Sequence, residues 1–198
     1  MEQAQVYEHI KFSSWVGPRY EHQSDCRCHL MVLGESHYEA DLPVARGDFT
    51  NEVVSRIVKR EDKGYRTRLF VKTSRLILQA MGKDPKKEDW RELWNSLLFY
   101  NFVQTILPDV RHRPTEDDWR TGETALPCVL EVHKPDLVLV LGIELAKRAK
   151  PIIVRSHPRI LPVVIKHPSA FGWSYKEEWV TELTKAMRGK KEDVQIIA

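Results

Sequence analysis

The sequence has little that would place the protein in a membrane or outside the cell. No apolar run approaches the ~20 residues that a membrane-spanning helix needs. The first segment, MEQAQVYEHIKF, is polar and mixed in charge, and it lacks the apolar core of a secretory signal. The three cysteines cannot form a disulfide framework. We therefore expect a cytoplasmic protein in a reducing compartment, with no membrane partner.

An excess of one sign of charge is also missing. The chain has 31 Lys and Arg against 28 Asp and Glu, for a net charge of +3, which says almost nothing about a nucleic-acid partner. Hydrophobic residues make up 42% and charged residues 30%, an ordinary composition for a globular protein. The 198 residues suit one domain and contain no internal repeat. We expect a single domain over residues 1–198 and a monomer.

Short apolar runs alternate with amphipathic stretches along the chain. The runs predict buried strands at residues 30–33, 97–100, 136–141 and 161–166. Helices are predicted near the start of the chain, from Asp48 or Thr50 to about Arg60, over 67–81, from Asp84-Pro85 onward, up to 133–135, over 143–150 and over 176–188. Residues 107–122 are predicted to form an exposed loop. This alternation predicts a three-layer α/β/α fold with a central, mostly parallel sheet of about four strands.

Polar residues follow three of the predicted strands. The first strand runs into the sequence Gly34-Glu35-Ser36-His37-Tyr38, the second meets Asn101, and the last ends in His167-Pro168-Ser169. The carboxyl ends of parallel strands lie at one edge of a sheet, where ligands bind in open α/β folds. Segments more than 130 positions apart are therefore expected to meet in one site.

In this order and strand context, the motifs resemble those of the uracil-DNA glycosylase superfamily. The segment 34–39 (GESHYE) stands where the family has G-Q-D-P-Y-H or G-E-x-P-G, Asn101 follows a middle strand, and the closing H-P-S is intact at 167–169. The segment from FYNFVQ to VLVLG resembles the iron–sulfur branch of the family. The resemblance covers roughly residues 30–175 and implies the family's α/β fold and a DNA partner.

The departures from the family pattern concern the first motif and the cluster ligands. Ser36 stands where the most active branch has Asp, and His37 replaces the motif's Pro. Thr105 stands where one cluster ligand would fall, and among the cysteines only Cys128 fits a ligand position. We therefore predict no iron–sulfur cluster, no metal site and no other cofactor.

The resemblance implies catalytic roles that suit the cleavage of an N-glycosidic bond, which builds positive charge on the sugar and negative charge on the base. Glu35 fits the Glu of the G-E motif and would stabilise the sugar cation and orient water, with Glu39 in reserve. His167 would donate a hydrogen bond to O2 of the departing base. Ser36 completes the predicted catalytic set. A solvated loop carboxylate is the alternative interpretation of Glu35.

Four further residues are predicted to bind the base. The side-chain amide of Asn101 would read the base edge, because it offers a donor and an acceptor and can match uracil or, rotated, cytosine. By the resemblance, Phe49 would stack on the flipped base, although it fits a helix staple nearly as well. Tyr38 matches the position that screens the pyrimidine 5-position. His37 would be a supporting residue that shares the role of His167 or contacts a phosphate.

The remaining predicted site residues would contact DNA. Base flipping leaves a gap in the stack that an apolar wedge can fill, and Phe171 occupies the family's wedge position, with Trp173 as the alternative. Ser169 would bind phosphate. Arg111 and Arg113, in the predicted loop, would add phosphate contacts unless they are merely solvated.

These features lead to three hypotheses. The first is a monofunctional DNA glycosylase that removes a flipped pyrimidine and leaves an abasic site. Uracil is the default base, but a modified pyrimidine is plausible, including a hypermodified phage cytosine, and the setting would be DNA repair or anti-phage defence. The second is a non-catalytic nucleic-acid-binding protein on the same fold, which Ser36 in place of Asp supports. The third, weaker because the G-x-S-x-G elbow is missing, is a serine hydrolase that uses Ser36 and His167.

Overall fold

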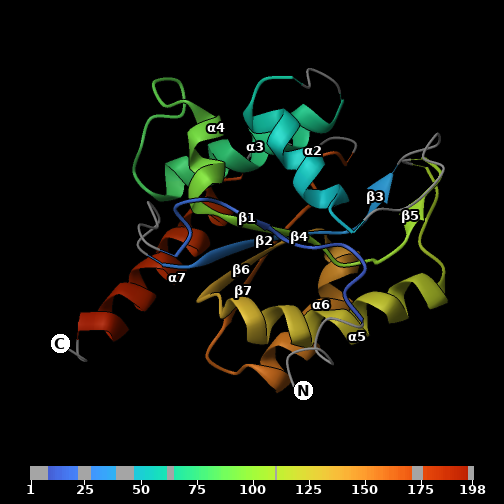
Figure 1. Ribbon diagram of the computed structural model, residues 1–198. Coiled ribbons are helices and arrows are strands. Elements are labelled where there is room, and N and C mark those ends of the chain that lie inside the picture. Colours follow the sequence, from blue (N-terminus) through green and yellow to red (C-terminus); the bar gives the residue numbers. More distant parts are fainter. Residues whose placement is uncertain are drawn as a thin grey trace.

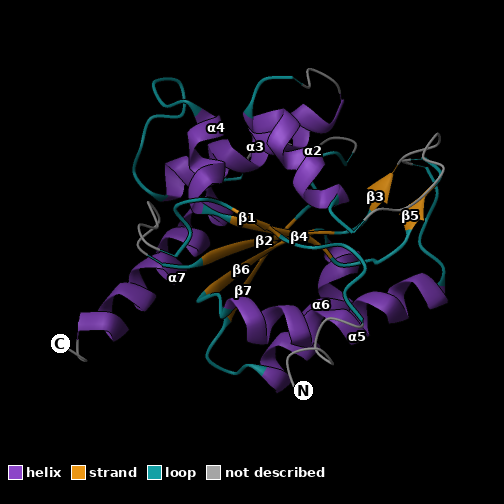
Figure 2. Ribbon diagram, in the orientation of Figure 1, coloured by secondary structure: helices purple, strands orange, loops and turns teal. Residues whose placement is uncertain are grey.

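The fold is mixed α/β, with one main sheet between two groups of helices (Figures 1 and 2). The computed structural model describes residues 9–21, 28–38, 47–61, 65–109, 111–170 and 176–195. Five strands form the main sheet in the order β1-β4-β2-β6-β7: β1 Trp15–Val16, β4 Leu98–Asn101, β2 Leu30–Gly34, β6 Leu137–Leu141 and β7 Leu161–Ile165.

The sheet is mostly parallel, as predicted. β4, β2, β6 and β7 run parallel, and the pairing of Gly34 with Asn101 brings the carboxyl ends of β2 and β4 level. The four predicted strands are confirmed within two residues at each end. β1, an antiparallel edge strand on β4, was not predicted because two residues are too short to show a period.

A small second sheet stands beyond the carboxyl ends of the main strands. It pairs β3, His37–Tyr38, in parallel with β5, Ile106–Leu107 (Figure 1). The backbone contacts between β2 and β4 also continue past the strands, since the Val103 N–H donates to the Glu35 carbonyl over 2.9 Å. These contacts hold the polar segment after β2 against the one after β4.

Helices cover both faces of the main sheet. α2, α3 and α4 lie on one side, and α5 and α6 lie on the other (Figure 1), while α7 packs against α3 and β7. The bounds are α2 Phe49–Val58, α3 Tyr65–Ala80, α4 Trp90–Leu93 with the 3₁₀ turn η1 Trp94–Ser96, α5 Glu116–His133, α6 Ile143–Ser156 and α7 Glu177–Gln195.

The central strands are apolar on both faces because each face packs on helices. In β2, Leu30 and Val32 join the core under α2, α3 and α7, whereas Met31 and Leu33 join the core under α5 and α6. All four side chains are fully buried. This double burial explains why the strand has a continuous apolar run instead of an alternating pattern.

One helix prediction is wrong in its start, and another lies partly outside the described residues. Asp84-Pro85 does not open a helix: the Asp84 side chain accepts the Lys86 N–H in a turn, and α4 begins at Trp90 after the cap Asp89. The short helix predicted near the start lies partly outside the described residues, and residues 9–21 contain no helix.

The predicted loop over 107–122 is also wrong in its second half, because α5 begins at Glu116. Thr115 and Asp118 form a capping box, in which each side chain accepts the backbone N–H of the other. This local chemistry outweighs the polar composition that suggested a loop. α6 likewise continues past Pro151 to Ser156, beyond the predicted end at residue 150.

Candidate active site

The order of the strands marks one position at the carboxyl edge of the sheet. From β2 the chain leaves to β4 on one side, and from the neighbouring β6 it leaves to β7 on the other. In open α/β sheets, ligands bind at such a switch point, outside the carboxyl ends of the two strands. The topology therefore places the candidate site over the ends of β2 and β6.

Both of these central strands end at a glycine. A Cβ on Gly34 would lie 2.2 Å from Asn101 Oδ1, so a larger residue would displace the Asn101 side chain. Gly142 has a φ of +131°, a backbone conformation that residues with a side chain rarely adopt. A Cβ added to Gly142 would lie 3.7 Å from His167 Cβ. At the centre of the edge, Gly34 and Gly142 carry no side chains. Asn101 and His167 lie on either side of this centre, after strands that are roughly 14 Å, or three strand spacings, apart.

Glu35 follows β2 directly at this edge and is only 9% exposed. Its Oε1 lies 3.4 Å from the Tyr38 hydroxyl and 3.4 Å from Arg113 Nη1. Burial raises the pKa of the Glu35 carboxyl, and the Arg113 charge and the Tyr38 hydrogen bond oppose this rise. A carboxylate with a raised pKa is suited to accept a proton near neutral pH.

Ser36 belongs to the same polar cluster as Glu35. Its hydroxyl donates to the Tyr38 oxygen over 3.0 Å, and Tyr38 in turn donates to Glu35. No hydrogen bond between Ser36 and His167 occurs among the described residues.

Asn101 ends β4 with its side chain turned toward His37. The Asn101 Nδ2 lies 3.1 Å from His37 Nδ1, and His37 Nε2 lies 2.9 Å from Thr50 Oγ1. The imidazole is 5% exposed and meets the rings of Phe12 and Phe49 edge-on, with centroids 5.3 Å and 4.9 Å away. Phe49 thus packs on His37 within the core, and its predicted stacking on a base stays a prediction.

His167 follows β7, and its environment favours the neutral ring. The Ser169 backbone N–H donates to His167 Nδ1 over 3.2 Å, which leaves the ring proton on Nε2. Burial, with the nearby charges of Arg113 and Lys72, lowers the pKa of His167 to about 4. The side chain is therefore a neutral hydrogen-bond donor at physiological pH.

Two side chains that the sequence analysis missed brace this edge. Gln104 is almost fully buried; its Oε1 accepts the N–H groups of Lys11 and Phe12, and its Nε2 donates to the Asn101 carbonyl. Lys72 Nζ donates to the Pro168 carbonyl over 2.7 Å. A polar residue three positions after Asn101 was the available signal for Gln104, whereas nothing local marks Lys72.

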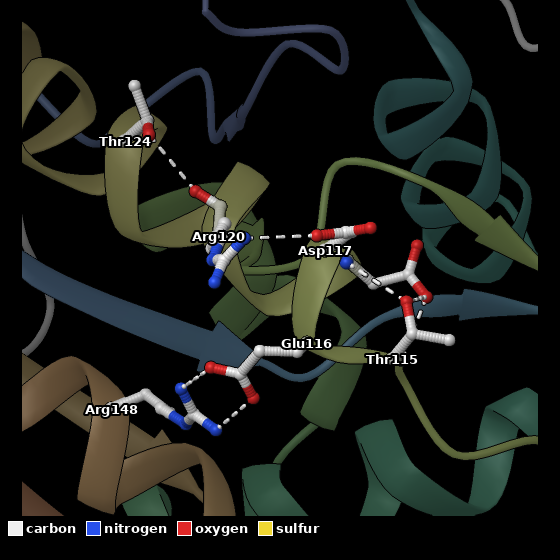
Figure 3. A network of polar contacts seen from close by, with 7 residues as sticks. Thr115, Glu116, Asp117, Arg120, Thr124 and Arg148 are labelled. Carbon is white, nitrogen blue, oxygen red and sulfur yellow. Dashed lines mark hydrogen bonds and ion pairs between the residues drawn. The ribbon is translucent and has the colours of Figure 1, made fainter.

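Arg113 reaches the site from the loop before α5. Thr115 and Asp118 cap this helix. Arg148 of α6 forms two hydrogen bonds with Glu116, of 2.7 and 2.8 Å (Figure 3). The start of α5 is therefore fixed to α6, next to the loop that carries Arg113. Arg111 is exposed in the same loop, and its backbone N–H bonds to Asp109.

Some predicted site residues lie outside this cluster or outside the described residues. Ser169 is partly buried beside His167. Glu39, Phe171 and Trp173 fall outside the described residues. Thr105 donates its hydroxyl to Asp118. Within the described ranges, no group of three or more His, Cys, Asp or Glu side chains is arranged to hold a metal ion.

Comparison with known proteins gives no relative for this site. No protein-family model matches the chain, and no curated protein matches it. None of the described helices is both long and apolar enough to cross a membrane.

Proposed function

We propose that the protein is a DNA glycosylase that hydrolyses the N-glycosidic bond of a flipped-out pyrimidine. The observation that supports this proposal is that the parallel strands β2, β4 and β7, which lead to Glu35, Asn101 and His167, all end at one edge of the sheet. Their order along the chain is the order of the uracil-DNA glycosylase motifs, and this resemblance is the source of the proposed chemistry.

In the proposed reaction, the bond between sugar C1′ and the base nitrogen breaks, and its electron pair leaves with the base. The Glu35 carboxylate stabilises the positive charge on the sugar and takes a proton from water, whose hydroxyl then bonds to C1′. His167 donates its Nε2–H to the base oxygen that becomes negative. The lowered pKa of His167 suits this role, because a neutral donor needs no change of charge before the reaction.

The other polar groups have supporting roles in this proposal. Asn101 binds the edge of the base, and Tyr38 limits the space next to the pyrimidine ring. Arg113, whose side chain is 66% exposed, and Ser169 contact phosphate. The substrate is uracil or a modified pyrimidine, including a hypermodified phage cytosine, and the setting is DNA repair or defence against phage.

Oligonucleotides test the proposal. Single-stranded and duplex DNA carrying uracil, cytosine, hydroxymethylcytosine or thymine, and intact phage DNA, are incubated with the protein and then with alkali, which cleaves at abasic sites. The proposal expects strand scission at one of these pyrimidines. Glu35→Gln and His167→Ala should each slow base release by about 10²–10⁴-fold.

Glu131 and His157 supply matched controls. They form a carboxylate–histidine pair near the C-terminal ends of α5 and α6, with His157 Nε2 3.2 Å from Glu131 Oε2. Glu131→Gln and His157→Ala should leave scission unchanged. Tight DNA binding without scission on any substrate would favour the non-catalytic alternative, and ester hydrolysis lost in Ser36→Ala would favour the hydrolase.

A further inference from the structure

A buried row of three polar side chains, Thr50, His37 and Asn101, runs from α2 to the end of β4. Thr50 is the second residue of α2 and is fully buried. His37 stands where the first motif of the uracil-DNA glycosylase superfamily, which residues 34–39 resemble, has proline. The row therefore ends on the amide that the proposed function assigns to base recognition, and it contains a residue that the resemblance does not explain.

The hydrogen-bond inventory of the row restricts its states. A neutral imidazole has one N–H donor and one acceptor nitrogen. The Asn101 Nδ2 can only donate, and it lies 3.1 Å from Nδ1 and 3.3 Å from Nε2 of the ring, so in this amide orientation the nearer Nδ1 is the acceptor. The reversed amide would need the other tautomer of His37. The ring proton is then on Nε2, 2.9 Å from Thr50 Oγ1, which accepts it. One tautomer makes both contacts hydrogen bonds.

The same geometry fixes where the other end of the amide points. With Nδ2 held on His37, Oδ1 lies over Gly34, in the volume that a Cβ of that residue would fill. Gly34 is the end of β2 at the switch point of the sheet. The acceptor end of the amide therefore lies beside the end of β2, on the face of the sheet that also holds Phe99.

The imidazole itself is held in place by aromatic packing. The Phe12 and Phe49 rings meet it edge-on from two different segments of the chain, at interplanar angles of 77° and 67°. Phe12 is in turn anchored by its backbone N–H, which Gln104 accepts. Reorienting the Asn101 amide would require His37 to change tautomer or move within this packing.

We propose that His37 is a positioning residue: together with Thr50 it locks the Asn101 amide with Oδ1 presented to the ligand. The site then favours a base whose edge offers an N–H donor at that point and disfavours one that offers an acceptor. This inference deepens the proposed function and depends on it for the identity of the ligand, but the lock itself is a property of the protein alone.

NMR on the protein without DNA tests the lock. With ¹⁵N in histidine and asparagine side chains, we expect His37 to show a protonated Nε2 and an unprotonated Nδ1. A two-bond ¹⁵N–¹⁵N coupling should join Asn101 Nδ2 to His37 Nδ1. The opposite tautomer in the folded protein, or a coupling to neither ring nitrogen, would overturn the proposal whatever the protein does to DNA.

Substitutions at Thr50 test the consequence for recognition. Thr50→Val removes the partner of Nε2 with little change in volume, and Thr50→Ser keeps a hydroxyl. We expect the ratio of kcat/KM between uracil and cytosine substrates to fall about tenfold in Thr50→Val and to be restored in Thr50→Ser. Thr73→Val is the matched control, because the Thr73 hydroxyl is buried without a partner, and it should leave the ratio unchanged.

The outcomes separate the two proposals. If the wild-type protein releases no base from any substrate, the proposed function fails, and the NMR result alone decides the role of His37. If it releases a base, a Thr50→Val variant that folds and slows both substrates equally would show that the row is only structural. In that case the positioning role is rejected and the glycosylase proposal stands.

Discussion

The interior of the sheet and its carboxyl edge bury different chemistry. In the interior, Leu30 to Leu33 of β2 and Leu137 to Leu141 of β6 are fully buried and apolar. At the edge, the chain buries six of the ten buried polar residues of the described part: Glu35, Ser36, His37, Thr50, Asn101 and Gln104. Burial of polar groups costs free energy unless they are hydrogen-bonded.

The buried polar groups of the described part differ in their hydrogen bonding. The two buried side-chain atoms without a partner in the described part are outside this group of six: Tyr100 OH belongs to β4 and Thr73 Oγ1 to α3. At the edge, each of the six polar side chains has a hydrogen-bond partner. The difference indicates that the edge is organised for a defined polar geometry, whereas the interior is held by apolar packing that tolerates isolated hydroxyl groups.

The largest expected effect would separate function from stability at the edge. Glu35→Gln and His167→Ala should each lower base release by about 10²–10⁴-fold, because each removes a group that acts on developing charge. Their unfolding free energies should change little by comparison. Single-turnover base release and urea unfolding on the same samples measure both; equal loss of activity and of folded protein would contradict the assignment.

A core substitution should show the reverse pattern. Leu139→Ala, in the centre of β6, should lower the unfolding free energy by about 2–5 kcal/mol, since it leaves a cavity in a fully buried position. Activity per folded molecule should stay close to that of the wild type. Urea titration with an active-site titration checks this, and loss of activity in fully folded protein would show that the interior and the edge are not separable.

The pH dependence of stability would sharpen the comparison at His167. Its pKa in the folded protein, about 4, lies below the ordinary value of 6.5, so the unfolded chain binds the proton more readily between these values. The stability that neutral His167 contributes is present above pH 6.5 and is lost as the pH falls toward 4, up to about 3 kcal/mol. His167→Asn should remove this dependence in urea titrations from pH 4 to 7, and His157→Ala should not.

The smallest effect concerns the partnerless hydroxyl groups of the interior. Tyr100→Phe should raise the unfolding free energy by about 1 kcal/mol, because it removes a buried hydroxyl that makes no hydrogen bond. Asn101→Ala, one residue further along β4, should lower the unfolding free energy, because His37 loses its contact with the Asn101 side chain. Thermal unfolding of the two variants compares the regions directly, and a loss of stability in Tyr100→Phe would mean that its hydroxyl has a partner.

The interior of this fold could be predicted from the sequence because it depends on short apolar runs. The runs before Gly34, Asn101 and Gly142 located three of the parallel strands, and their order placed the polar segments at one edge. β1 could not be found, because Trp15–Val16 carries no pattern and pairs with a strand more than 80 positions away.

The geometry of the site was predicted less well than its location. The residues after β2 were recognised as a polar cluster, but the enclosure of His37 depends on Phe12 and Phe49, which come from separate segments. The bracing by Gln104 and Lys72 likewise depends on contacts over about 90 positions or more. Sequence spacing indicates which residues reach the edge, whereas tertiary packing decides which of them face one another.

The most direct test of the central claim is to detect the free base by mass spectrometry after one turnover on uracil-containing and modified-pyrimidine DNA. We expect the wild-type protein to release one base per abasic site, and Glu35→Gln, still folded, to release it about 10²–10⁴-fold more slowly. Folded wild-type protein that binds these DNAs and releases no base from any of them would contradict the account.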